Sequence, residues 1–124
     1  MRTVKLALVA TFTLGAAMAS NPPAGHAATT DGNWNVTIIT EKGTCDRTYS
    51  YNVDVSNGRV IYRGSTFIKL AGTVAPDGLV KVNISAGNQG ASGTGRLSGS
   101  EGTGVWRGRG TAGACAGRWE AVRL

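Results

Sequence analysis

Apolar and polar residues alternate along most of the chain from residue 33 onward. This period of two is typical of β-strands that bury one face, and no long helical pattern competes with it. Turn-forming residues separate the alternating runs and indicate eight short strands. The expected strands span residues 33–41, 47–55, 59–63, 66–74, 79–86 and 91–98, followed by two strands within 102–122.

Short turns are expected between these strands. Asn57 and Gly58 suit a tight hairpin because both residues tolerate positive φ. Pro76-Asp77-Gly78 combines a φ preset by proline with the freedom of glycine. Connections this short favour an antiparallel meander in which each strand pairs with the next one.

The last predicted hairpin carries two tryptophans among glycines. Trp106 lies two residues from both Gly104 and Gly108, and Trp119 lies two residues after Gly117. Residues two apart share one face of a strand, so each indole ring shares its face with glycines. We expect this hairpin to complete a small barrel, with space for the rings above the glycine backbone.

The chain contains two cysteines, and their positions favour a closed sheet. Cys45 follows the first predicted strand and Cys115 begins the last one, so a Cys45–Cys115 disulfide would link the two edges of the meander. The predicted fold is therefore all-β, a small eight-stranded antiparallel up-and-down β-barrel closed by one disulfide. A six-stranded barrel or a sandwich stays open as an alternative if the glycine-rich strands are irregular.

The first 27 residues have the order of a secretory signal peptide. Arg2 and Lys5 precede an uncharged, mostly apolar run, which is too short to span a bilayer well. Cleavage after Ala27 is preferred, and cleavage after Ala19 is the alternative. We expect residues 28–124 to form a single domain that is exported to the periplasm or the extracellular space, where disulfides persist.

Removal of this leader changes the candidate chemistry. The leader contains His26, the only histidine, so the mature chain has no Ser-His or Cys-His pair and no imidazole metal ligand. We therefore expect no catalytic residues, no metal site and no cofactor. A carboxylate-based hydrolase using Asp54 and Glu120 stays as a weaker alternative.

Basic residues exceed acidic ones in the mature chain, which keeps 11 Lys and Arg against 7 Asp and Glu. Four arginines project from the outer side of the last three predicted strands and form a candidate anion-binding patch: Arg96, Arg107, Arg109 and Arg118. Guanidinium groups bind phosphate and carboxylate, so an anionic polysaccharide or a lipid headgroup would suit them. A solvated face without a ligand is the favoured interpretation, and nucleic acid is not expected because no aromatic residues stand between the arginines.

Six aromatic residues fall on the predicted inner face: Trp34, Tyr49, Tyr51, Tyr62, Trp106 and Trp119. Either these rings fill the interior, or a cavity for one small ligand remains at one mouth of the barrel. Close packing of the rings is the favoured expectation because protein interiors are normally dense. Apolar residues on the inside are the reverse of an outer-membrane barrel, so we do not expect the protein to span a membrane.

Several segments of the mature chain resemble a group of small exported β-rich proteins of alphaproteobacteria. The resemblance covers most of residues 31–123 and rests on DGNWNV (31–36), TCDRTY (44–49), VSNGRV (55–60) and the tryptophan segments of 95–121. It implies export but no activity. The general plan is also similar to lipocalin-like, avidin-like and protease-inhibitor barrels, in architecture only.

These observations favour an exported, non-enzymatic barrel that binds either a small molecule or an anionic surface. This hypothesis rests on two features: the predicted scaffold is rigid and closed by a disulfide, and the mature chain lacks the residue pairs expected of a catalytic site. The alternative is an inhibitor of a secreted or periplasmic protease, with a turn or the N-terminal segment as the inserting element.

Overall fold

The computed structural model of the 124-residue chain describes residues 3, 15 and 29–124. The predicted signal peptide, His26 and both alternative cleavage positions lie outside the described residues, apart from the isolated positions 3 and 15. In the part of the chain that is described, no helix has the length and apolar character needed to cross a membrane.

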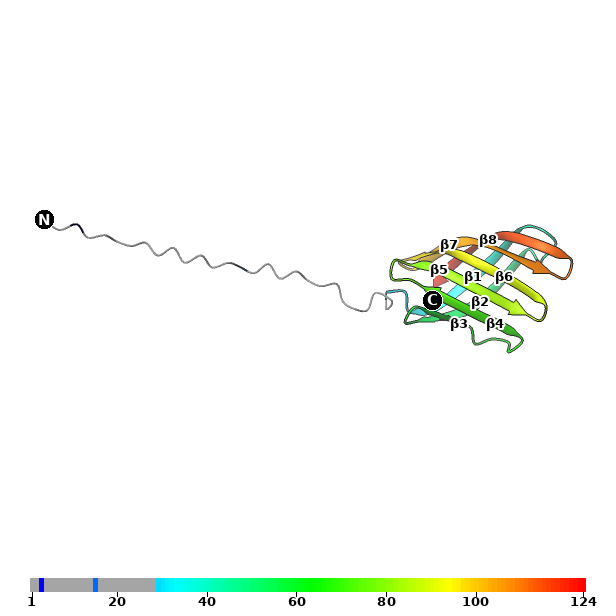
Figure 1. The fold of residues 1–124 in the computed structure, drawn as a ribbon, viewed down its shortest axis with the longest axis horizontal. Helices are drawn as coiled ribbons and strands as arrows, with labels where there is room; N and C mark the ends of the chain where they lie inside the picture. Colours follow the sequence, from blue (N-terminus) through cyan, green and yellow to red (C-terminus); the bar gives the residue numbers. More distant parts are fainter. Residues whose placement is uncertain (1–2, 4–14, 16–28) are drawn as a thin grey trace.

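Antiparallel strands close into one barrel in the described domain (Figure 1). The eight strands are β1 (Gly32–Lys42), β2 (Thr48–Ser56), β3 (Arg59–Ile61), β4 (Ile68–Val74), β5 (Leu79–Ala86), β6 (Gln89–Ser98), β7 (Glu101–Gly110) and β8 (Gly113–Arg123). Each strand pairs with its neighbours in chain order, and β8 pairs with β1 to complete the circle. The predicted up-and-down barrel is confirmed, and the six-stranded and sandwich alternatives are wrong.

The alternation of apolar and polar residues decides which side chains face the interior. Inward positions are mostly apolar and buried or half-buried, whereas most of their neighbours along each strand are more exposed. The buried cluster consists of Trp34, Val53, Val55, Val74, Val80, Leu97, Trp119 and Ala121. Burial of this apolar surface is the main driving force for folding of such a domain.

The seam between β1 and β8 is held by hydrogen bonds and by the disulfide. Cys45 and Cys115 are bonded with an S–S distance of 2.01 Å and a Cα–Cα distance of 6.1 Å, which confirms the predicted pairing. In the same seam, Ile39 is the register partner of Arg118. The covalent bond therefore joins the β1–β2 connection to β8, beside the seam where the first and last strands pair.

The third strand is shorter than predicted. It ends at Ile61 rather than Arg63, and β4 begins at Ile68 rather than Thr66. Ser65 makes local hydrogen bonds instead: its amide donates to the Tyr62 hydroxyl (3.3 Å), and its hydroxyl accepts from the Phe67 amide (3.2 Å). Such local bonds compete with strand pairing, so the chain forms a loop here.

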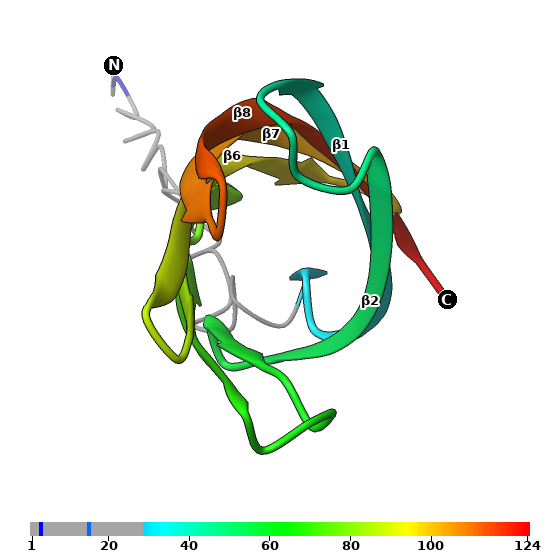
Figure 2. The same cartoon turned by 90° about the vertical axis from the view of Figure 1, so that its right-hand side faces the viewer.

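The two ends of the barrel differ. One end is covered by residues 29–31, where the Trp34 indole donates to the Thr30 carbonyl at 2.9 Å. The Arg123 guanidinium lies 4.8 Å from the centre of the Trp34 ring and donates to the carbonyls of Thr29, Asp31 and Gly99. This end is therefore closed by side chains. Figure 2 looks onto the other end, which is called the open end because the cavity described below reaches it, and shows the β1–β2, β3–β4, β5–β6 and β7–β8 connections around its rim.

Candidate ligand-binding cavity

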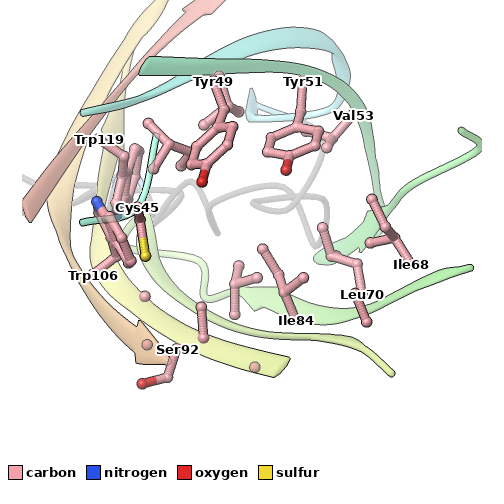
Figure 3. A pocket seen from close by; sticks show the side chains of 18 of the residues that line it. Cys45, Tyr49, Tyr51, Val53, Ile68, Leu70, Ile84, Ser92, Trp106 and Trp119 are labelled. Atoms are coloured by element: carbon pink, nitrogen blue, oxygen red, sulfur yellow. The ribbon is translucent and has the colours of Figure 1, made fainter. Parts of the chain in front are cut away.

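A cavity of about 470 Å³ lies inside the barrel, and its lining extends from Asp46 and Arg109 at the open end to Trp34 and Leu97 at the closed end. Figure 3 shows its lining, which comes from both sides of the barrel. Side chains at the closed end, such as Trp34 and Leu97, are almost fully buried. Toward the open end the inward side chains lie along the strands instead of meeting in the centre. The expectation that the aromatic rings fill the interior is therefore wrong.

Two indole rings lie against the glycine-rich strands because their N–H groups bond to the barrel backbone. The Trp119 indole donates to the Thr94 carbonyl at 3.2 Å, and the Trp106 indole donates to the Ile39 carbonyl at 3.0 Å. A Cβ atom at Gly104 would lie 2.5 Å from Cε2 of Trp119, so glycine is needed beneath that ring. Held in this way, the rings form one side of the cavity and leave its centre open.

Three tyrosines form a second aromatic surface. The rings of Tyr49 and Tyr51 are stacked with centroids 6.3 Å apart, and Tyr62 meets Tyr51 edge-on at 5.8 Å. In Figure 3 the hydroxyl groups of Tyr49 and Tyr51 point into the cavity. These hydroxyls give an otherwise apolar chamber a small number of polar contacts.

The tyrosine hydroxyls are able to donate hydrogen bonds to a ligand. The Tyr49 hydroxyl accepts from the Asp46 amide (3.1 Å), so its O–H hydrogen stays free to donate. We find no partner for the Tyr51 hydroxyl among residues 29–124. Burial raises the pKa of Tyr51, and Tyr49 and Tyr62 raise it further. Tyr51 therefore stays a neutral phenol with its proton available.

Aliphatic side chains form the side of the cavity opposite the tryptophans. Ile68 and Leu70 come from β4, and Val82 and Ile84 from β5 (Figure 3). Charged residues contribute to the lining only at the mouth, where Asp46 and Arg109 stand. The deep part of the cavity therefore suits uncharged, largely apolar groups, because an unpaired charge would lose its hydration there.

The structure places the six predicted interior aromatics as follows. Trp34, Tyr49, Tyr51, Trp106 and Trp119 line the cavity. Tyr62 lies just after β3 and packs against Tyr51 and the buried cluster. Their placement on one face follows from strand alternation, as the sequence predicts, but the open space between them does not.

The four arginines of the predicted anion-binding patch do not form one free cluster. Arg96 contacts Asp77 at 3.4 Å near the closed end, and Arg118 forms ion pairs with Glu120 (2.9 Å) and Glu41 (3.7 Å). Among residues 29–124 we find no ion pair for the other two, Arg107 and Arg109. The patch is divided because acidic residues from neighbouring strands and turns neutralise half of it.

Thr40 is a residue of the mouth that sequence reasoning missed. Its side chain is only 5% exposed, and its hydroxyl donates to the Asp46 carbonyl at 2.6 Å. Its amide donates to the Arg47 carbonyl at 2.9 Å. These bonds hold the β1–β2 loop beside the opening. The sequence does contain a signal for this role, because Thr40 is a polar residue at an inward position of an alternating strand.

The acidic residues considered for hydrolysis lie on the outer surface in ion pairs. Asp54 accepts from Arg63 at 2.8 Å, and Glu120 accepts from Arg118. The described residues contain no group of three or more His, Cys, Asp or Glu side chains that could hold a metal ion. Neither carboxylate lines the cavity.

Comparison with known proteins supplies no relative from which a ligand could be inferred. Neither a protein-family model, nor a curated protein, nor a solved structure matches this chain. The resemblance to small exported proteins of alphaproteobacteria stays a prediction. The function must therefore be inferred from the chemistry of the cavity and of the surface around its mouth.

Proposed function

We propose that this protein is a non-enzymatic binding protein that takes up a small, largely apolar molecule in its barrel. The observation that carries this proposal is the cavity of about 470 Å³, closed at one end and open at the other. Sites for small organic molecules typically measure roughly 300–1,000 Å³ and are lined mainly by apolar and aromatic groups. The cavity agrees with both criteria.

The polar groups of the cavity narrow the ligand class. The hydroxyls of Tyr49 and Tyr51 both offer a hydrogen, so the ligand needs a hydrogen-bond acceptor such as a carbonyl or ether oxygen. The indole faces of Trp106 and Trp119 favour a planar or aromatic part on the opposite side. A charged group on the ligand is expected to stay at the mouth, near Arg109.

Titration with a neutral fluorescent probe, N-phenyl-1-naphthylamine, tests this function. We expect saturable binding to one site, with a rise in probe fluorescence. Leu70→Trp places a large ring in the cavity and should abolish binding. Ala71→Trp is the matched control because Ala71 is the next residue on β4 and is exposed. Circular dichroism shows whether both variants fold.

Two results would contradict the proposal. One is the absence of saturable binding to the unmodified protein by the probe or by a panel of small carbonyl compounds. The other is equal binding by folded Leu70→Trp and Ala71→Trp, which would place the probe outside the cavity.

We infer further that the protein acts outside the cytoplasm, in the periplasm or the extracellular space. The disulfide supports this location, as does the order of charge, apolar run and small residues in the first 27 residues. Intact mass measurement of protein from the host's extracytoplasmic fractions is expected to give a chain that begins at Ala28. A chain that begins at Ser20 would favour the alternative cleavage, and an intact leader would contradict export.

A further inference from the structure

A row of outward-facing residues crosses five adjacent strands near the open end. The register places Asn83 beside Ser92, Ser92 beside Arg107, Arg107 beside Ala116, and Ala116 beside Lys42. These residues line a shallow depression on the outer surface. The depression lies on the outer face of the barrel wall, and it shares Ser92 and Arg109 with the lining of the cavity.

The depression is cationic. Lys42, Arg107 and Arg109 stand around it, and the small residues Ala114 and Ala116 lie between them. For these three cations we find no ion pair anywhere in residues 29–124. The adjacent acidic residue, Glu41, is already paired with Arg118. The positive charge of this surface is therefore available to an external anion.

An exposed aromatic ring lies next to the cationic depression. Phe67 is 68% exposed in the β3–β4 loop, at the open end of the barrel. A Cβ atom at Gly87 would lie 3.3 Å from Cζ of Phe67, and the following residue, Asn88, lines the depression. An exposed apolar ring therefore lies beside the β5–β6 turn, at one edge of the surface that carries the three cations.

We propose that this surface docks on an anionic phospholipid bilayer. Lys42, Arg107 and Arg109 contact lipid phosphate groups, and Phe67 enters the interfacial layer, which accepts an aromatic ring beside basic residues. A soluble polysaccharide would satisfy the cations but leave the exposed ring without an apolar partner. A bilayer satisfies both, and it brings the mouth of an apolar cavity against an apolar phase.

Sedimentation with lipid vesicles tests the docking surface. We expect strong binding to vesicles that contain phosphatidylglycerol, weak binding to pure phosphatidylcholine, and loss of binding at high salt. Lys42→Ser with Arg107→Ser should weaken binding about 25-fold, because one basic residue at an anionic surface is worth about fivefold. Phe67→Ser should weaken it about tenfold, through loss of apolar burial.

A matched double variant separates a local site from a general effect of charge. Arg59→Ser with Arg96→Ser removes the same net charge, but both positions lie near the closed end on β3 and β6. We expect this control to bind vesicles almost as well as the unmodified protein. The cavity probe should bind all of these variants equally in the absence of lipid, so failure of docking is distinguishable from failure of the cavity.

Four outcomes would contradict the proposal. The first is equal binding to neutral and anionic vesicles. The second is an equal loss of binding in the two double variants, which would indicate net charge alone. The third is binding to heparin, used as a soluble polyanion, without binding to anionic vesicles, which would assign the cations to a polysaccharide. An undiminished affinity of Phe67→Ser would also contradict the role of the ring.

Discussion

Glycine residues on β6 and β7 determine how the Trp119 ring lies in the barrel. Cβ atoms at Gly95 and Gly104 would collide with the ring and with the carbonyls of Thr103 and Thr94. Without those atoms the indole lies directly on the backbone, where its N–H reaches the Thr94 carbonyl. The space that a side chain would have occupied becomes available to the ring, and the centre of the barrel stays open.

A single methyl group should test this arrangement. Gly104→Ala is expected to destabilise the protein by about 1–3 kcal/mol, because the ring or the strand must move to accept it. Gly93→Ala is the control: it lies on the same side of the barrel, but its nearest contacts would be at 3.6 Å. Urea unfolding followed by tryptophan fluorescence measures both. Equal effects would contradict the role given to Gly104.

The hydroxyl of Tyr51 should decide between ligands with and without an acceptor. Tyr51→Phe is expected to weaken binding of a carbonyl-bearing ligand about fivefold, which corresponds to the usual value of about 1 kcal/mol for one hydrogen bond. Binding of a hydrocarbon of the same shape should not change, because it makes no such bond. Isothermal titration of the two ligands gives the comparison, and an equal loss for both would indicate a packing effect instead.

At the scale of elements, the β1–β2 connection is the best anchored part of the mouth. Thr40 bonds to the backbone of Asp46 and Arg47, and Cys45 is joined to Cys115 on β8. Gly43 allows the loop to approach β8, since a Cβ there would meet Sγ of Cys115 at 2.7 Å. One side of the opening is therefore fixed, whereas the β3–β4 loop opposite is held by local bonds of Ser65.

Removal of the disulfide should lower stability without changing the fold. The cysteines are 70 positions apart, so the chain-entropy estimate for Cys45→Ser with Cys115→Ser is a loss of about 4 kcal/mol. Denaturant unfolding of the double variant, compared with that of the oxidised unmodified protein, measures this loss, and the reduced unmodified protein should match the variant. A loss of well under about 1 kcal/mol would show that the β1–β8 hydrogen bonds alone keep the seam closed.

The β4–β5 turn should make stability depend on pH. The Leu79 amide lowers the pKa of Asp77, and Arg96 lowers it further. The charged carboxylate therefore stabilises the folded state above its ordinary pKa of about 4, and this contribution is lost as pH falls through the lower folded value. Asp77→Asn should be less stable than the unmodified protein at pH 7, and the difference should disappear in acid. A difference that is constant with pH would contradict this account.

At the scale of the whole molecule, one residue connects the first and last segments of the domain. Arg123 in β8 donates to the carbonyls of Thr29 and Asp31 at the start of the described domain and to that of Gly99 in the β6–β7 turn, and it covers Trp34. Among the described residues it covers the end of the barrel opposite the mouth, so the proposed function predicts that a ligand enters through the mouth.

Arg123→Gln should therefore cost more than an ordinary surface substitution. We expect a loss of about 2 kcal/mol or more, because several hydrogen bonds from a charged donor disappear together. Arg118→Gln is the control, since its exposed ion pairs are worth less than about 1 kcal/mol. Thermal and urea unfolding give the two values. Equal losses would show that the closed end does not depend on Arg123.

Local patterns were enough to predict the barrel. Period-two alternation defines the strands, and Asn57 and Gly58 do adopt positive φ values of 51° and 76° at the predicted hairpin. Cys45 and Cys115 show that the first and last strands meet. The exception was β3, which was predicted to include Tyr62 and Arg63. The chain forms a loop there instead, with local hydrogen bonds made by Ser65.

The sequence by itself determined which residues face inward, the order of the strands and the closure of the sheet, because each of these depends on spacing along the chain. Only the tertiary structure decided that the interior is partly open, since the direction of each ring depends on carbonyls of other strands, as for Trp106 and Ile39. It also decided which arginines are free, because Arg96 and Arg118 find their acidic partners across turns and neighbouring strands. Side-chain partners distant in sequence are set by the fold, and no local pattern records them.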